Sequence, residues 1–529
     1  MLFTSYGFIG FLIILFALYY LLPKKLQWPL LLLADYVFYW FAGPGFLLYI
    51  LSTTVTVYLS AMGIAVLADR QKEYLTLRKA ELSREERRDY KAGVKKKQQL
   101  CMLAGLLVNL AVLAAVKYTN FAIANINALL SLFGGGPLSF LDIALPLGIS
   151  FYTFQALGYL IDVYRGTAEA ERSPFKFALF VSFFPQLIQG PISRFNDLKD
   201  GLFSEHSFDS AVFSRGLQRV LWGYFKKLVI ADRILTGVNA IIGSPELYNG
   251  GFAFVGMLFY ALELYADFTG GIDITIGIAE ALGIPVKENF IRPFFSKSVK
   301  EYWRRWHITM GTWFTDYIFY PISVCKPMLR FSKFARAHFG NTIGKRLPVY
   351  LSSFAVWLAT GVWHGAGWNF VAWGLGNWVI IMVSQELEPL YERFHQRFHV
   401  SGKTWFRAFQ VIRTVFLMSA LRMFDCYRNV PLTFRMFFSI FSGRGWAEVF
   451  NGGLMGLGLS GLDYGILAFG LVLLLTVSLI QRSGSVRDKL ARKPYPLRFA
   501  VWFGLFIIVL LAGEYGIGYD QSQFIYNQF

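Results

Sequence analysis

The sequence predicts an all-α protein that crosses a membrane many times, and three observations point to this class. Apolar residues make up 55% of the 529 residues, whereas charged residues make up only 16%. A soluble domain carries about 25% charged residues, so a chain this poor in charge cannot cover a water-facing surface. The apolar residues also gather in runs, several of them roughly 20 residues long, the length of a helix that spans a bilayer. A soluble enzyme, a disordered chain and a disulfide scaffold are therefore excluded.

Three apolar runs open the chain, at 3–22, 26–41 and 46–67, and we expect each one to be a membrane-spanning helix. The segment 69–97 follows, with eleven Lys or Arg residues against six Asp or Glu residues. Cytoplasmic loops of membrane proteins collect Lys and Arg, so we expect this segment to be a cytoplasmic helix. The basic pair at 24–25 then falls on the same side, which makes the N-terminus extracellular.

The middle of the chain does not suit regular spans. Prolines interrupt the run 174–190, and the segment 292–327 mixes charged residues with tryptophans. Irregular backbone at membrane depth is tolerated only inside protein or beside a cavity. We therefore expect re-entrant helices in a central region that regular spans surround.

A second basic loop, 481–498, precedes the last apolar run at 498–513. We expect this loop in the cytoplasm and the C-terminal tail outside the cell. The predicted organisation is a membrane domain at 1–480 and a C-terminal part at 481–529, in a multi-pass protein of the plasma membrane. Cytoplasmic loops account for the net charge of +18, so we expect no nucleic-acid partner.

His364 lies between apolar runs, in Gly361-Val-Trp-His-Gly-Ala-Gly-Trp-Asn-Phe370. A polar ring inside a membrane is costly and marks a functional site by default. The flanking glycines let a substrate or another backbone come close to the imidazole. A buried histidine that bonds a carbonyl of a neighbouring helix explains the pattern equally well, and the residue types leave both interpretations open.

His307 ends a dense mixture of aromatic and cationic side chains, Lys300-Glu-Tyr-Trp-Arg-Arg-Trp-His307. Trp and Arg together are typical of a helix at the level of the lipid headgroups. The same residues suit a pocket for an anionic acyl donor, because guanidinium groups bind phosphates. The residue types alone favour neither interpretation.

The remaining polar residues give weaker signals. His395 and His399 have an i,i+4 spacing without nearby carboxylates, so we expect no metal site. The chain has no Gly-x-Ser-x-Gly elbow, Walker loop or His-Glu-x-x-His motif, which argues against the corresponding soluble enzymes. We expect the carboxylates within apolar runs to form structural ion pairs rather than ion-transport sites. The expected partners are Arg165, Arg292, Arg304 and Arg305. These carboxylates are Asp162, Glu263, Asp267, Asp273 and Asp316.

Four further segments belong to one pattern. They are Pro146-Leu-Gly-Ile-Ser-Phe-Tyr-Thr-Phe-Gln155, Phe183-Phe-Pro-Gln-Leu-Ile-Gln-Gly-Pro-Ile192, Phe225-Lys-Lys227 with Ala231-Asp-Arg233, and Tyr265-Ala-Asp-Phe-Thr-Gly270. Together with the segments around His307 and His364, they resemble the membrane-bound O-acyltransferase family over roughly residues 1–425. The resemblance is to the bacterial branch that acetylates alginate and D-alanylates teichoic acids. The chain departs from the alginate-type pattern at Ile322-Ser-Val-Cys-Lys-Pro327 and Leu421-Arg-Met-Phe424.

The resemblance implies a fold and a reaction. The fold is a ring of tilted helices around a thin central partition, with a tunnel from the cytoplasmic to the extracellular face. The reaction moves an acyl group from a cytosolic thioester across the membrane to a hydroxyl. His364 is the implied catalytic histidine and His307 its companion. The residues expected to bind the donor or the acceptor are Trp303, Arg304, Arg305, Trp306, Asp316, Trp363 and Asn369.

The last seven residues, Gln523-Phe-Ile-Tyr-Asn-Gln-Phe529, form a second resemblance. They are similar to the Phe-x-Tyr-x-x-Phe ending of the small peptide that accompanies the teichoic-acid D-alanyltransferase, whose tyrosine is the implied acyl carrier. Tyr526 is then the implied carrier in this chain, on a helix fused to the enzyme, and Phe524 and Phe529 anchor the tail. An ordinary aromatic anchor at the membrane interface explains the same residues.

These patterns predict O-acylation, first of all O-acetylation, of an exported or cell-envelope polysaccharide. The expected donor is acetyl-CoA or the phosphopantetheine thioester of an acyl-carrier protein, with no permanently bound cofactor. The expected partners are membrane lipids, the donor, the polysaccharide and an extracellular acyltransferase of the SGNH type with a serine nucleophile. D-alanylation of teichoic acids is the alternative within the family. A transporter of polysaccharide precursors is the alternative from another class, although the sequence shows no internal repeat.

Overall fold

The structure, a computed structural model, describes residues 3–516, and these residues form helices and loops without a β-strand. The chain divides into two compact units. Unit 1 holds Met1–Ser214 with Ile278–Lys287, and unit 2 holds Arg215–Gly277 with Glu288–Phe529. The prediction of an all-α protein is confirmed.

Within residues 3–516, five helical segments are long and apolar enough to cross a membrane. They are Pro44–Leu77, Arg84–Leu132, Gly251–Ala281, Gly461–Ser483 and Tyr495–Ala512. A sixth span is added if Trp368–Glu386 and Glu388–Phe398, which are bent by 52°, are counted as one. The chain is therefore a multi-pass membrane protein, as predicted.

Among its described residues, unit 1 contains eight complete α-helices and the start of a ninth, which continues into unit 2. They are α1 (Tyr6–Leu21), α2 (Gln27–Trp40), α3 (Leu47–Leu77), α4 (Arg84–Leu132), α5 (Ile149–Arg165), α6 (Pro174–Ser182), α7 (Phe184–Leu187), α8 (Phe195–Phe203) and α9 (Ser210–Tyr224).

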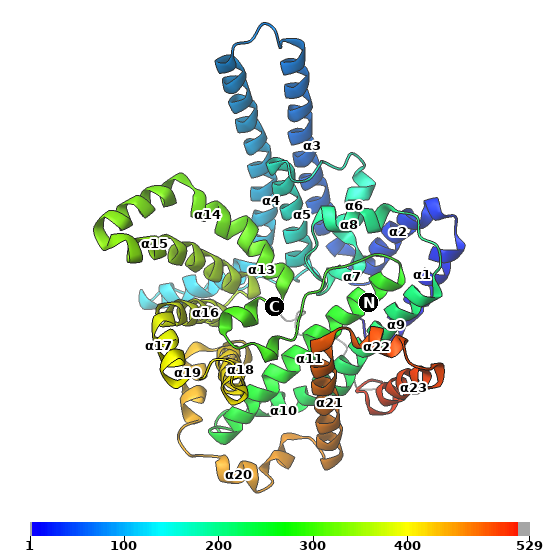
Figure 1. The fold of residues 1–529 in the computed structure, drawn as a ribbon, viewed down its shortest axis with the longest axis vertical. Helices are drawn as coiled ribbons and strands as arrows, with labels where there is room; N and C mark the ends of the chain where they lie inside the picture. Colours follow the sequence, from blue (N-terminus) through cyan, green and yellow to red (C-terminus); the bar gives the residue numbers. More distant parts are fainter. Residues whose placement is uncertain (1–2, 517–529) are drawn as a thin grey trace. The chain divides into compact units, whose positions relative to one another are not determined.

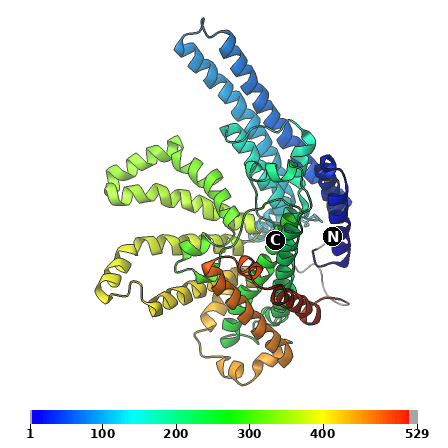
Figure 2. The same cartoon turned by 45° about the vertical axis from the view of Figure 1, so that its right-hand side comes forward.

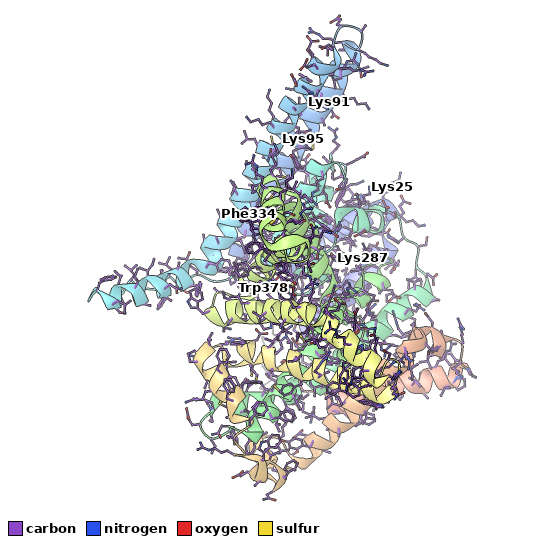
Figure 3. The ribbon with its side chains drawn as sticks, turned by 60° about the vertical axis from the view of Figure 1, so that its left-hand side comes forward. Lys25, Lys91, Lys95, Lys287, Phe334 and Trp378 are labelled. Atoms are coloured by element: carbon purple, nitrogen blue, oxygen red, sulfur yellow. The ribbon has the colours of Figure 1, made fainter. Side chains whose placement is uncertain are left out.

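The predicted cytoplasmic segment 69–97 joins α3 to α4, and Figures 1 and 2 show the two helices side by side up to this turn. Ser83 and Glu86 start α4 with a capping box, in which each side chain accepts a hydrogen bond from the other residue's N–H. Lys95, which Figure 3 labels, lies on α4. Its Nζ is 3.8 Å from the centroid of the Tyr164 ring on α5. The segment is thus mostly helical, as predicted.

The proline-rich run 174–190 is broken into α6 and α7, also as predicted. The buried carboxylate of Asp35 on α2 accepts hydrogen bonds from residues on both sides of this break. Its Oδ1 accepts from the Phe184 N–H at 2.8 Å, and its Oδ2 accepts from the Ser182 hydroxyl at 3.1 Å. These hydrogen bonds supply partners for polar groups that have none within the interrupted helix.

Unit 2 contains the remaining helices. They are α10 (Asp232–Gly243), α11 (Gly251–Ala281, which ends in unit 1), α12 (Val299–Trp303), α13 (Ile308–Phe314), α14 (Tyr320–Val324), α15 (Lys326–His364), α16 (Trp368–Glu386), α17 (Glu388–Phe398), α18 (Thr404–Tyr427), α19 (Val430–Ser439), α20 (Trp446–Phe450), α21 (Gly461–Ile480), α22 (Val486–Ala491) and α23 (Tyr495–Ala512).

Two π-helices interrupt unit 2, η3 (Phe225–Ala231) and η5 (Thr315–Phe319). A π-helical turn is rare and frequently lies at a functional site. η3 carries Lys226 and Lys227, and η5 carries Asp316. The segment 292–327 otherwise consists of short helices, so its predicted irregular backbone is confirmed.

Candidate active site

Two glycines bring α15 and α16 into backbone contact next to His364. A Cβ atom built on Gly361 would lie 2.5 Å from the Phe370 carbonyl oxygen, and one built on Gly374 would lie 2.5 Å from the Trp357 carbonyl oxygen. Only glycine allows this approach. The glycines therefore set the distance between the His364 segment and the helix that covers it.

His364 is the last residue of α15 and is 5% exposed. Its imidazole meets the Trp373 ring of α16 edge-to-face, with the ring centroids 4.5 Å apart. α15 reaches this position after a sharp bend at Gly340, whose φ of 74° is accessible to glycine (Figure 2). The imidazole thus lies in an aromatic, nearly closed environment.

His307 lies between α12 and α13, fully buried, with a left-handed φ of 49°. Such a conformation is uncommon outside glycine and is found where the surroundings impose it. Phe268 and Phe290 pack against the imidazole, with ring centroids 4.9 Å and 6.4 Å away. A charged imidazolium in these surroundings would be costly, so His307 is held neutral.

Asn289 sets the protonation of the His307 ring. The Asn289 Oδ1 accepts from the backbone N–H of Thr309 at 3.0 Å and from its hydroxyl at 2.9 Å. His307 Nδ1 lies 3.1 Å from the amide Nδ2 and 3.3 Å from Oδ1. Because Oδ1 already accepts both hydrogen bonds from Thr309, we assign Nδ2 as the donor to Nδ1. In a neutral ring that accepts at Nδ1, the proton is on Nε2, so His307 is a hydrogen-bond donor at Nε2.

Trp363 connects the two histidines. Its ring centroid lies 6.0 Å from that of His307 and 5.1 Å from that of His364. The structure therefore brings His307 together with the consecutive residues Trp363 and His364 in unit 2, although His307 comes from a different segment of the chain.

A buried ion pair lies beside them that the sequence analysis did not single out. Arg422 on α18 binds Asp425 at 2.8 Å. Its guanidinium carbon lies 5.7 Å, 5.2 Å and 4.9 Å from the ring centroids of Trp303, Trp306 and Trp373. The Arg422 charge acts on His307 and further disfavours an imidazolium there. The signal was Leu421-Arg-Met-Phe424, a charged residue inside an apolar run, which the sequence analysis treated only as a departure from the family pattern.

The other residues predicted to bind the donor or the acceptor differ in their contacts and in their exposure. Trp303 and Asn369 join helices, because Trp303 Nε1 donates to Asn377 Oδ1 at 3.0 Å and Asn369 Nδ2 donates to the Phe424 carbonyl at 3.2 Å. Arg305 is paired with Glu301 at 2.5 Å. Arg304 is exposed, and Asp316 is half-buried on the π-helix η5.

Two of the predicted carboxylates on α11, Asp267 and Asp273, form structural ion pairs, and their partners include lysines as well as arginine. Asp273 binds Arg219 at 2.9 Å and Lys226 at 2.6 Å. Asp267 binds Lys227 at 2.6 Å. These partners differ from the predicted arginines, because Lys226 and Lys227 of the π-helix η3 and Arg219 of α9 bind the two carboxylates instead.

Tyr526, Phe524 and Phe529 lie outside the described residues, so their predicted role stays a prediction. The described part of the tail is held at its start. Arg233 Nη2 contacts the Ala512 carbonyl and Glu514 Oε1, each at 2.8 Å, and the Glu514 N–H donates to the Leu228 carbonyl at 2.9 Å.

Residues 170–427 match the family model of the membrane-bound O-acyltransferase family. This range contains both histidines, Asn289 and the Arg422–Asp425 pair. Three curated relatives agree with the match. The probable alginate O-acetylase AlgI of Azotobacter vinelandii is 32% identical over 450 residues, which cover 84% of this chain and 79% of the relative.

The other two relatives act in the cell envelope by their names. The peptidoglycan O-acetyltransferase of Helicobacter pylori is 31% identical over 326 residues, 56% of this chain and 58% of the relative. The teichoic acid D-alanyltransferase of Bacillus subtilis is 28% identical over 243 residues, 44% of this chain and 58% of the relative.

Proposed function

Because the chain belongs to the membrane-bound O-acyltransferase family and is an O-acyltransferase, we propose that it O-acetylates an exported or cell-envelope polysaccharide. The alginate O-acetylase and the peptidoglycan O-acetyltransferase support acetyl as the group transferred. The observation that carries the proposal is the packing of His307 and His364 around Trp363 in unit 2. The family assignment favours this enzyme over the transporter.

In the proposed reaction, His364 acts as the general base and His307 as a hydrogen-bond donor. His364 takes the proton from an attacking hydroxyl, whose oxygen bonds to the carbonyl carbon of the acetyl thioester. His307 Nε2–H donates to the carbonyl oxygen as negative charge develops there. The carbon–sulfur bond then breaks, and the proton on His364 passes to the leaving thiolate.

The donor is an acyl thioester, and we propose that it reaches the site from the cytoplasm, as acetyl-CoA or on the phosphopantetheine of a carrier protein. A tunnel through a thin partition would let the thioester react without moving its charged part through hydrocarbon. The N- and C-termini are proposed to be extracellular, so that an acetylated tail meets its acceptor, or an SGNH-type partner, outside.

D-alanylation of teichoic acids is the second candidate. The Bacillus subtilis relative and the Phe-x-Tyr-x-x-Phe tail favour it. The two reactions use the same base and differ in the acyl group, so the mass of the transferred group distinguishes them.

The test is the substitution His364→Ala, measured as polymer-bound acetyl groups in cells that express the variant at the normal level. Since general-base catalysis contributes about 10²–10⁴-fold, acetylation should fall to background. His338→Ala is the matched control, because His338 is exposed on the same helix and its substitution should leave the amount of polymer-bound acetyl unchanged. Full acetylation by the His364 variant would refute the proposal, and loss of polymer export would favour a transporter.

A further inference from the structure

A cavity of about 670 Å³ lies in unit 2, and neither histidine lines it, although Phe290, which packs against His307, does. It is lined by α21 and α23, by the loop with α22 that joins them (Figure 1), and by residues of α9, α11 and the segment 288–292. Sites for small molecules are typically about 300–1,000 Å³, so this volume suits one organic ligand. None of the proposed catalytic steps uses it.

One half of the cavity is apolar. Phe469, Leu473 and Val477 line it from α21 at a spacing of four residues, which places them on one helix face. Val501, Leu505 and Ile508 line it from α23 at spacings of four and three residues, which also places them on one helix face. Both helices are candidate membrane spans, and of the α23 residues only Leu505 is buried. This half is therefore a slot between two spans that face lipid.

The other half of the cavity is cationic. Arg219, Lys226, Arg292 and Arg487 line it, against the two carboxylates Asp273 and Glu288. Both carboxylates are already bound: Arg219 contacts Glu288 at 2.6 Å and Asp273 at 2.9 Å, and Lys226 contacts Asp273 at 2.6 Å. The four cationic side chains thus outnumber the two carboxylates, and one of the four, Arg487, also donates from Nη1 to the Arg215 carbonyl at 2.8 Å.

Among these cationic side chains, Arg292 is the clearest case of a positive charge without a carboxylate beside it. Within residues 3–516, no carboxylate lies within ion-pair distance of its guanidinium group, which instead packs 4.7 Å from the centroid of the Phe295 ring. Burial and the neighbouring positive charges of Arg305 and Arg482 lower the pKa of Arg292. An anion beside Arg292 would offset this repulsion.

We propose that the cavity holds a phospholipid with an anionic headgroup. The phosphate lies against Arg292 and Arg487, and one acyl chain lies in the slot between α21 and α23. Charge complementarity selects the headgroup, and the basic loop 481–498 draws anionic lipid to this place. The lipid fills the contact between α23 and the rest of unit 2, which side chains leave open.

The apolar slot distinguishes a lipid from the thioester donor. A pantetheine arm carries two amides, and buried amides without hydrogen-bond partners are costly. Between 469 and 477 on α21 and between 500 and 508 on α23, the lining side chains are apolar apart from the Trp502 indole. An acyl chain needs no hydrogen bonds there, so the slot suits the lipid.

The experiment uses the full chain purified in a mild detergent. Phospholipid is extracted from the pure protein and quantified by mass spectrometry, and we expect one anionic phospholipid per chain. After delipidation, phosphatidylglycerol should raise the melting temperature, whereas phosphatidylcholine and acetyl-CoA should not. Stabilisation by acetyl-CoA alone would mean that the cavity is a donor site and would overturn the proposal.

Two variants locate the lipid. The double substitution Leu473→Trp with Val501→Trp fills the slot and should abolish lipid retention, while Leu475→Trp, on an exposed position of the same helix, should retain it. Arg292→Gln should weaken retention of phosphatidylglycerol about fivefold, and the exposed Arg492→Gln should not. If the double variant does not fold, the comparison of Arg292→Gln with Arg492→Gln tests the proposal by itself. Equal retention of phosphatidylglycerol by these two variants would refute the proposal.

Discussion

The two histidines of this enzyme differ in what their surroundings permit. His307 is fully buried and accepts a hydrogen bond from Asn289 at Nδ1, so it is suited to donate from Nε2 and not to take up a proton. His364 packs edge-to-face on Trp373 at the end of α15. A division of roles follows, with a donor at His307 and a base at His364.

This division predicts that glutamine replaces His307 better than leucine does. His307→Gln keeps an N–H donor of similar reach, whereas His307→Leu removes it and should lower kcat/KM for acetyl transfer about 10²–10³-fold. His364→Gln should be as inactive as His364→Ala, since glutamine cannot accept the proton. The measurement is acetyl transfer by the purified variants in lipid vesicles. Equal losses for Gln and Leu at position 307 would contradict the donor role.

The buried Arg422–Asp425 pair predicts a compensating double variant. Arg422→Met alone leaves Asp425 as an uncompensated buried charge, and breaking a buried pair costs about 3–5 kcal/mol. Arg422→Met with Asp425→Leu removes both charges and should recover much of the thermal stability, while activity stays low if Arg422 organises the tryptophans around the site. Thermal unfolding and activity are measured on the same samples. A double variant no more stable than Arg422→Met would contradict this account of the pair.

At the scale of the helices, the active site depends on how closely α15 and α16 approach. Gly361 and Gly374 carry this contact, and no side chain substitutes for hydrogen there without moving a backbone. The bend at Gly340 brings the second part of α15 onto α16 (Figure 2). The local sequence thus determines where the imidazole of His364 lies relative to Trp373.

Gly361→Ala should therefore destabilise the protein and lower its activity. The added Cβ would meet the Phe370 carbonyl at 2.5 Å, and overpacking of this kind costs about 1–3 kcal/mol. Gly465→Ala is the matched control, because nothing lies within 4 Å of a Cβ at that position of α21 and Gly465 does not line the cavity. Thermal unfolding and acetyl transfer check both variants, and a Gly361 variant as stable and active as the control would show that the helices can separate freely.

The helical class and the broken segments could be predicted from the sequence, because an apolar run or a proline determines the structure of its own segment without distant contacts. The residues around His307 and His364 could be found only by resemblance, since Trp and Arg suit a lipid interface as well as a site. Asn289 and Asp425 were missed because their roles come from tertiary contacts with His307 and Arg422. The ion pairs of Lys226 and Lys227 with α11 depend on the π-helix η3, which no pattern in the local sequence predicts.

At the scale of the whole molecule, the unusual feature is a tail that begins at a fixed point. Arg233 holds the end of α23 through Ala512 and Glu514, and it also pairs with Asp463 at the start of α21. Tyr526 is the twelfth residue after Glu514, and eleven residues lie between them. Fully extended, they reach about 40 Å, which is longer than the hydrocarbon core of a bilayer. A tail tethered in this way has the reach that an acyl carrier needs.

The carrier hypothesis predicts an acyl adduct on Tyr526 that depends on His364. A phenol has a pKa near 10 and is easier to activate than an alkyl hydroxyl, and its acetyl ester keeps a good leaving group for a second transfer. Tyr526→Phe removes the nucleophile and keeps the ring, so polymer acetylation should fall to background, whereas Tyr515→Phe at the start of the tail should be silent. Mass spectrometry of the C-terminal peptide should find acetyl, or D-alanyl if the alternative holds, in the wild type and neither in the His364→Ala variant. Normal acetylation of the polymer by the Tyr526→Phe enzyme would mean that the hydroxyl of the acceptor attacks the thioester directly and that the tail is an interfacial anchor.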